Sequence, residues 1–182
     1  PFDSNNSLCR LRGDGTLRLV WPDCSLQCPV SCCSKCDKNP ATANNSMSTK
    51  SFEVVNKIQN ISVKNPADST EQEIRRSALY WILNSDKLEM DISSTQFDER
   101  YILSVFYYSL NGSEWYVQDS TWMSSSHQCA WKGITCDTSP NVIAINLPSN
   151  NLNGQLPYEL GDLKSLHEID VHENKISGSI PS

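Results

Sequence analysis

The sequence predicts an α+β chain with three parts: a disulfide-rich N-terminal module, a helical region, and the start of a solenoid of short parallel strands. Three observations lead to this fold class. Six of the eight cysteines lie within the first 36 residues. Apolar residues recur with helical spacing in two segments between residues 70 and 110. From residue 142 onward the chain repeats itself at an offset of 24 residues.

Residues 1–40 are the predicted disulfide module, because their cysteine density is too high for a stretch that could build its own apolar core. We expect three internal bridges, with the pairing left open, among Cys9, Cys24, Cys28, Cys32, Cys33 and Cys36. A zinc site is the weaker interpretation, since residues 1–126 contain no histidine. Alternating leucines around Gly13-Asp14-Gly15 predict a hairpin, and Arg12-Gly13-Asp14 is read as part of its turn rather than as an adhesion motif.

The cysteine count also indicates the compartment. An even number with no leftover thiol fits the secretory pathway or the cell surface, where disulfides persist. We expect any signal peptide to lie outside this sequence, because the chain begins at Pro1 without an apolar leader. The Asn-x-Ser sequons make four residues candidates for glycosylation: Asn5, Asn44, Asn60 and Asn111.

Charge and hydropathy exclude other classes of partner. Fifteen basic residues against 21 acidic residues give a net charge of −6, and Lys and Arg do not cluster. Nucleic acid and anionic membrane surfaces are therefore not expected partners. The longest apolar run, Tyr101 to Leu110, is too short to span a membrane, so no transmembrane segment is expected in this chain.

Residues 41–69 are rich in Ser, Thr and Asn and are predicted to be a linker, with one strand or one turn of helix at most. Two amphipathic helices are predicted after it. The first begins at a capping box made by Thr70 and Glu73 and continues to about Leu83. The second covers about Thr95 to Leu110, and Asn111-Gly112 provide its stop signal.

The internal repeat supports the solenoid. Seven positions match at the 24-residue offset: Ile145 with Ile169, Leu147 with Val171, Asn150 with Asn174, Leu152 with Ile176, Gly154 with Gly178, Leu156 with Ile180 and Pro157 with Pro181. The alternating apolar residues predict a short strand in each coil with one face turned to the core. Asn150 and Asn174 follow the strands, where a side-chain amide can satisfy main-chain groups of the turn and of the neighbouring coil.

The pattern L-x-x-L-x-L-x-x-N-x-L-x-G-x-I-P resembles the plant-type leucine-rich repeat family, including the ectodomains of its receptors. Just upstream, Cys129-Ala-Trp131-Lys-Gly133-Ile-Thr-Cys136 is similar to the cysteine cap of that family, and the resemblance implies that Cys129 and Cys136 are paired. Residues from about 71 onward also resemble leucine-rich repeat proteins of diatom-like algae, in which two cap helices and a stretch like that from Tyr101 to Trp115 precede the capping cysteines.

This resemblance implies a helical and disulfide cap over residues 70–140 and one and a half repeats over residues 141–182. A solenoid normally needs about three coils. We therefore expect the sequence to be part of a longer protein. We also expect further repeats or a partner chain to cover the C-terminal edge, where Ile169, Val171, Ile176 and Ile180 would otherwise meet water.

In function, the resemblance implies an extracellular recognition or scaffold protein and not an enzyme. Its strand face would bind a protein, peptide or polysaccharide through Asn146, Ser149, Glu168, Asp170, His172 and Glu173. The acidic residues of the second coil indicate a basic or cation-bridged partner. The alternative function is a structural subunit of a wall, filament or surface complex, assembled through the open solenoid edge and the cysteine module.

No catalytic, metal or cofactor site is expected. His167 and His172 are five residues apart on a predicted strand, so their side chains would point to opposite faces, unlike the ligands of a zinc motif. Four tryptophans could form a stacking platform, but burial in a cap is the favoured interpretation. They are Trp81, Trp115, Trp122 and Trp131.

Overall fold

The computed structural model describes residues 49–62, 69–116 and 121–181. The chain divides between Phe52 and Glu53, and the fold below is that of the second unit. The predictions made for the six N-terminal cysteines, for the hairpin with its Arg-Gly-Asp turn, and for the sequons at Asn5 and Asn44 lie outside the described residues.

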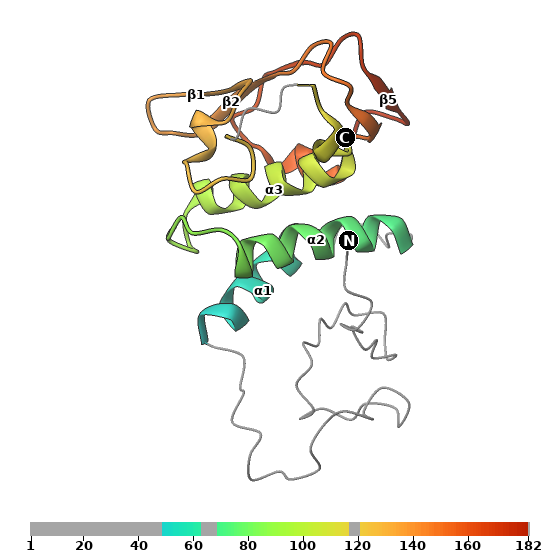
Figure 1. Ribbon diagram of the computed structural model, residues 1–182. Helices are drawn as coiled ribbons and strands as arrows, with labels where there is room; N and C mark the ends of the chain where they lie inside the picture. The colour runs from blue at the N-terminus through green and yellow to red at the C-terminus, as the bar shows by residue number, and fades with distance from the viewer. Residues whose placement is uncertain (1–48, 63–68, 117–120, 182) are drawn as a thin grey trace, which may run out of the picture. The chain divides into compact units, whose positions relative to one another are not determined.

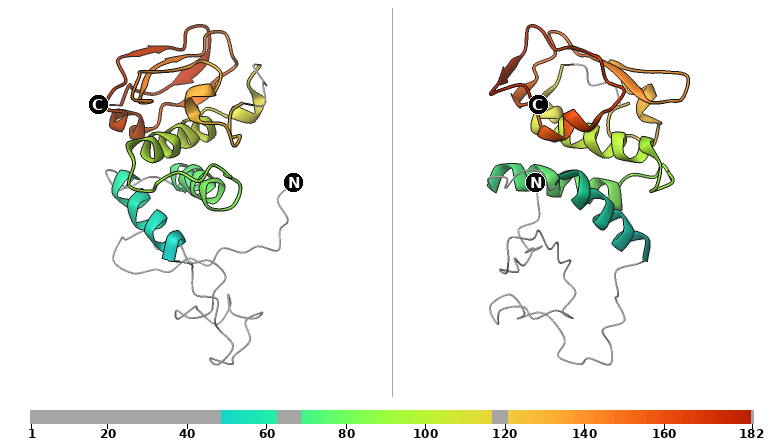
Figure 2. Two further views of the ribbon diagram at one scale, coloured as in Figure 1. Left: turned by 90° about the vertical axis from the view of Figure 1, so that its left-hand side faces the viewer. Right: turned by 180° about the vertical axis from the view of Figure 1, so that it is seen from behind.

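Helix α3, Thr95–Ser109, lies between helix α2, Ser69–Asn84, and the strands (Figures 1 and 2). It has packing partners on both sides, so apolar residues on more than one of its faces are buried. The hydroxyl oxygen of Ser94 accepts a hydrogen bond from the Phe97 amide and so caps the N-terminus of α3. Asn111 ends it in the left-handed region, with φ at 56°. Both helices predicted after residue 69 are thus confirmed.

Helix α1, Thr49–Ser62, corrects the expectation of a linker with at most one strand or one helical turn. Val54, Val55 and Ile58 are buried, and their spacing places them on one helical face. The Lys57 ammonium lies 3.1 Å from a carboxylate oxygen of Asp98 on α3. The apolar signal in this stretch is brief among many Ser, Thr and Asn residues. The helix is stabilised by tertiary contacts more than by propensity.

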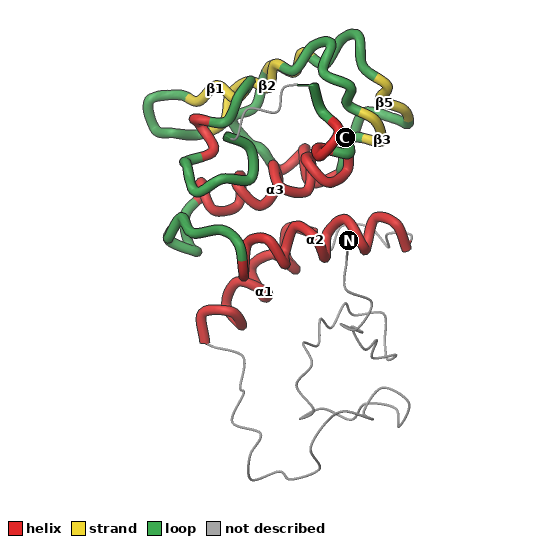
Figure 3. The backbone as a smooth tube through the Cα atoms, viewed as in Figure 1, coloured by secondary structure: helices red, strands yellow, loops and turns green. Residues whose placement is uncertain are grey.

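The rest of the described chain consists of short strands and 3₁₀ turns joined by loops (Figure 3). Strands β1 (Ile134–Cys136), β2 (Val142–Asn146) and β4 (Glu168–Asp170) form one sheet in the order β1-β2-β4. Strand β1 runs antiparallel to β2, whereas β4 runs parallel to it. Strands β3 (Asn153–Gln155) and β5 (Lys175–Ser177) form a second, parallel pair. The 3₁₀ turns are η1 (Gly112–Glu114), η2 (Gln128–Ala130) and η3 (Tyr158–Asp162).

The register of the first sheet follows the sequence repeat, because Ile145 lies opposite Ile169. The second sheet differs. Gly154 lies opposite Ile176, an offset of 22 residues, and not opposite Gly178 as the 24-residue alignment would have it. Side chains alternate between the two faces of a strand, so a register shift of two residues does not change which side chains point toward the core.

Asn174 joins the two coils, as the sequence predicts for an asparagine after the strand. Its Oδ1 accepts hydrogen bonds from the amides of Asn150 and Leu152, at 3.0 and 2.9 Å. Its Nδ2 donates to the carbonyl oxygens of Leu147 and Val171, at 2.8 and 2.9 Å. One side chain thereby satisfies main-chain groups of its own coil and of the coil before it.

Replacing Asn174 by alanine is expected to lower the free energy of unfolding by about 2 kcal/mol, because several part-buried main-chain groups lose their partner together. Urea denaturation of the two proteins measures the loss. Asn153→Ala is the matched control, since Asn153 is an exposed asparagine of β3 and its replacement should change stability by less than about 0.5 kcal/mol. Equal losses in the two variants would mean that the Asn174 contacts contribute nothing of their own.

The four tryptophans named above are buried, as predicted. Trp122 lies 4.9 Å from Trp115 and 5.0 Å from Trp131, measured between ring centroids. The fully buried guanidinium of Arg100 lies over the rings of Trp81 and Trp131, at 5.0 and 4.9 Å from their centroids. These rings therefore enclose a buried cation as well as apolar surface.

The Cys129–Cys136 disulfide implied by the family resemblance is present, with the two Cα atoms 5.6 Å apart. It links η2 to β1, the antiparallel strand that precedes the first parallel pair. The bond closes a short loop at the end of the sheet, beside the buried Trp131.

Candidate ligand-binding surface

The predicted strand-face residues lie on β2 and β4 and on the turns that follow these strands. Asn146 and Asp170 are register partners on the two parallel strands. Asn146, Ser149 and Glu168 are exposed. His172 and Glu173 are exposed too, and Asp170 is half-buried. The parallel pairing therefore places residues that are 24 positions apart in sequence next to one another on one surface.

Four of these residues form the acidic cluster, which we define as Ser149, Asp170, His172 and Glu173. The hydroxyl of Ser149 donates to a carboxylate oxygen of Glu173 at 2.5 Å. The Nδ1 atom of His172 lies 2.6 Å from Asp170 Oδ1, and the Ser149 amide donates to the His172 carbonyl at 2.9 Å. Asn146 and Glu168 lie on the same strands but outside this cluster.

The geometry of the acidic cluster differs from that of a nucleophile and its base. Ser149 and His172 each bond to a different carboxylate through their side chains, so the serine is not hydrogen-bonded to the imidazole. This surface carries three carboxylates, those of Glu168, Asp170 and Glu173, and one imidazole, that of His172. The surface is thus built to accept hydrogen bonds and to attract positive charge.

The hydrogen bond between His172 and Asp170 lowers the pKa of Asp170 and raises the pKa of His172. For Asp170, the stabilising contribution is present above its unfolded pKa and is lost as the pH falls through the lowered value. For His172, the contribution is present below its unfolded pKa and is lost as the pH rises through the raised value. Between these limits the two side chains form an ion pair.

Asp170→Asn is expected to bring the pKa of His172 down toward its ordinary value of about 6.5, because the asparagine carries no charge. NMR titration of the His172 ring protons measures this shift. Glu168→Gln removes a carboxylate of the same strand that does not bond to His172, and it should leave the titration nearly unchanged. A His172 titration that is the same in all three proteins would rule out the pairing in solution.

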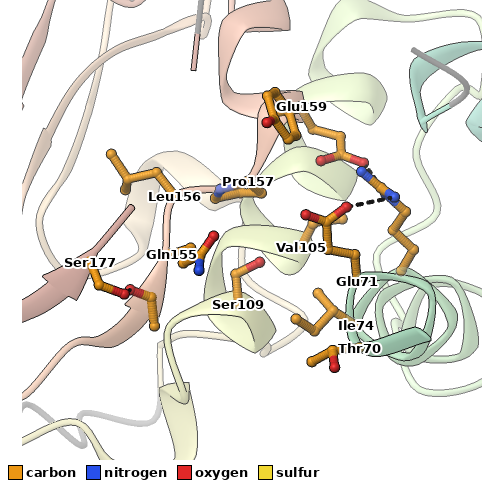
Figure 4. Close-up of a pocket in the computed structure, with 13 residues that line it drawn as sticks. Thr70, Glu71, Ile74, Val105, Ser109, Gln155, Leu156, Pro157, Glu159 and Ser177 are labelled. Atoms are coloured by element: carbon orange, nitrogen blue, oxygen red, sulfur yellow. Dashed lines mark hydrogen bonds and ion pairs between the residues drawn. The ribbon is translucent and has the colours of Figure 1, made fainter. Parts of the chain in front are cut away.

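A pocket of about 350 Å³ lies between α2, α3 and the segment from β3 to η3 (Figure 4). Arg75 of α2 donates to Glu159 of η3 at 2.5 Å and lies 3.5 Å from a carboxylate oxygen of Glu71. Arg75 and Glu159 are both buried and are 84 residues apart in sequence. The sequence did not predict this site, because no local pattern links residues as far apart in sequence as Arg75 and Glu159.

Comparison with known proteins finds plant receptor proteins among those similar to this chain. Receptor-like protein 3 of Arabidopsis thaliana is 40% identical over 68 residues, which are 36% of this chain and 9% of that protein. The LRR receptor-like serine/threonine-protein kinase ERECTA of the same plant is 45% identical over 59 residues, or 32% of this chain and 6% of that protein. The crystal structure of PEPR1–AtPEP1 aligns with 42% of this chain and 12% of that chain, at 36% sequence identity and a TM-score of 0.34.

The chain is related to the plant leucine-rich repeat receptors. No protein-family model matches it. The similarity spans less than a tenth of the length of the two receptor proteins compared above. The acidic cluster lies at the ends of β2 and β4, which pair in parallel, and β3 pairs in parallel with β5 farther along the same two segments. Among the described residues, no helix has the length and apolarity needed to cross a membrane.

Proposed function

We propose that this chain belongs to an extracellular leucine-rich repeat recognition protein that binds a protein, peptide or polysaccharide through its strand face. One observation carries the proposal: two parallel strands and the turns that follow them bring Asn146, Glu168 and the acidic cluster onto one surface. Asn146, Glu168 and Asp170 lie on the strands themselves, and strands hold side chains more rigidly than free loops do. The relationship to plant receptor-like proteins supports the same class of function.

The ligand expected at this surface carries donors and positive charge. Glu168, Asp170 and Glu173 outnumber the one imidazole, so a basic peptide segment or a cation-bridged acidic glycan fits best. The Cys129–Cys136 disulfide supports a location outside the cytosol, since such bonds persist in oxidising compartments.

Binding of a basic and an acidic peptide of equal length to the 182-residue chain tests the proposal. The basic peptide is expected to bind more tightly, and either Asp170→Asn or Glu173→Gln should weaken its binding. Glu89→Gln is the matched control, because Glu89 is an exposed carboxylate of the loop between α2 and α3. Equal weakening by the control would mean that net charge, and not the strand face, determines binding.

The alternative function, a structural subunit that assembles through the solenoid edge, is favoured by a different observation. Ile169 is 39% exposed and Ile180 is 84% exposed, whereas Ile145, one coil earlier, is fully buried. We propose that a further coil or a partner chain packs against this edge. Light scattering separates the two functions: a monomer that binds peptide supports recognition, whereas a concentration-dependent assembly supports the structural role.

A further inference from the structure

The pocket between α2, α3 and the segment from β3 to η3 shares no residue with the predicted strand face. Figure 4 shows Glu159 at one end of it, Ser177 at the other, and Gln155 and Ser109 between them. We propose that this pocket binds one ring of an uncharged sugar, with the sugar hydroxyls on its polar side chains and the carbon–hydrogen face of the ring on its apolar walls. This proposal does not depend on the function proposed for the strand face.

Three side chains of the pocket have hydrogen-bonding capacity that the described protein does not use. One carboxylate oxygen of Glu159 bonds to Arg75, but the other, Oε2, is buried and has no hydrogen-bond partner among the described residues. The side chains of Ser109 and Gln155 make no hydrogen bond within the part of the chain that the structure describes. A buried acceptor without a donor is unfavourable, and serine and glutamine side chains can both donate and accept. The ligand that fits them offers donors and acceptors together, as a hydroxyl group does.

Gly154 explains how Ser109 and Gln155 come to line the same pocket. A Cβ atom at Gly154 would lie 2.1 Å from the carbonyl oxygen of Ser109, so only glycine allows β3 to approach the end of α3 this closely. The Asn153 amide donates to the Leu110 carbonyl oxygen at 3.1 Å in the same contact. Ser109 and Gln155 both adjoin this contact and both line the pocket. The fold thus brings a hydroxyl and an amide from two elements to one site.

The apolar walls fit the other part of a sugar ring. Ile74 and Val105 come from the two helices, and Leu156 and Pro157 follow β3. Tyr158, the first residue of η3, also lines the pocket, and it is 46% exposed. A tyrosine combines an apolar ring with a polar hydroxyl. A sugar ring has the same combination, because its carbon–hydrogen faces are apolar and its edge carries the hydroxyls.

Size and charge both favour a small uncharged ligand. The pocket volume, about 350 Å³, is near the lower end of the range for small-molecule sites. Arg75 and Glu159 are buried and are already paired with each other at 2.5 Å. A charged ligand would compete with this pair, and separating a buried pair is costly. A hydroxyl can reach the free oxygen of Glu159 without that cost, since the terminal torsion of a glutamate is broad and its carboxyl group can rotate to meet a donor.

Titration of the 182-residue chain with the methyl glycosides of glucose, galactose and mannose, followed by methyl NMR, tests the proposal. We expect saturable shifts of the Ile74 and Val105 methyl signals with at least one of these uncharged sugars, with a Kd on the order of 10 mM. The amino sugar and the uronic acid of the same series carry a positive and a negative charge. Both should bind no more tightly than the uncharged glycoside.

Two variants test the polar side chains. Gln155→Ala and Ser109→Ala should each weaken binding roughly threefold to tenfold, because each removes a hydrogen-bonding group from the pocket. Asn153→Ala is the matched control, since Asn153 is an exposed amide of the same strand as Gln155 and does not line the pocket. Urea denaturation of each variant checks that it is folded under the conditions of the titration.

The outcomes distinguish the source of the sugar as well. Tighter binding of a tetrasaccharide than of the methyl glycoside of the same sugar would identify a glycan chain as the ligand, and the reverse order would identify a free sugar. Binding of cyclohexanol as strong as that of the best glycoside, a preference for a charged sugar, equal weakening by Asn153→Ala, or no shift of the pocket methyls would overturn the proposal. None of these results would affect peptide binding at the strand face.

Discussion

Replacing Arg100 by alanine is expected to lower the free energy of unfolding by about 3–5 kcal/mol, because it removes one partner of a buried ion pair. The Nε and Nη2 atoms of Arg100 donate to the two carboxylate oxygens of Asp86, at 2.6 and 2.8 Å. Its Nη1 and Nη2 atoms also donate to the carbonyl oxygens of Ser126 and Ser124, at 2.8 and 2.6 Å. The alanine variant would leave Asp86 as a buried carboxylate without its counter-charge.

A loss of this size is a large part of the stability of an ordinary domain, so the variant should unfold at much lower urea concentration or fail to fold. Arg76→Ala is the control. Arg76 forms an exposed pair with Glu73 at 2.6 Å, and its loss should cost no more than about 0.5 kcal/mol. Arg100→Met combined with Asp86→Leu should recover part of the stability, since neither buried charge remains. If Arg100→Ala were as stable as Arg76→Ala, the buried network would not stabilise the fold.

The second large effect is expected at Ile145, which occupies the same position in the first coil as Ile169 in the second. Ile145→Ala should lower the free energy of unfolding by about 2–5 kcal/mol, because Ile145 is fully buried and its truncation leaves a cavity. Ile169→Ala should cost on the order of 1 kcal/mol, because a side chain that is 39% exposed loses less burial.

Urea denaturation of the two variants at several protein concentrations measures this difference. A loss at Ile169 as large as that at Ile145 would show that the edge is covered in solution. In that case the denaturation midpoint should depend on protein concentration, as expected for a self-associating chain. A small loss at Ile169 with no concentration dependence would show that the edge is open to water in the 182-residue chain.

Local patterns were enough to predict helices α2 and α3 and the first parallel pair. Helical spacing from residue 70 and the stop at Asn111-Gly112 are signals carried by neighbouring residues. Asn150 and Asn174 could be given a role from their place after each strand, and the structure confirms that role for Asn174. Repetition made the predictions for the strands and for Asn174 possible, because each coil supplied an independent copy of the pattern.

The parts that were missed depend on contacts between distant residues. Helix α1 has few apolar residues, and its burial against the rest of the fold could not be read from its own sequence. The bonds of Arg100 to Asp86 and of Arg75 to Glu159 join separate elements. The composition of a helix shows that an arginine is present, but only the tertiary structure shows that its charge is buried and paired.

The bonds of Asn174 have a direction along the stack. Its side chain reaches back to Leu147, Asn150 and Leu152 of the preceding coil. In a stack built this way, each coil receives part of its turn bonds from the coil that follows it, and the last coil alone lacks that part. That end penalty arises once, whatever the number of coils, so stability per coil should rise with stack length as in a one-dimensional nearest-neighbour lattice. Unfolding should then start at the end whose turn bonds are missing and move toward the helices.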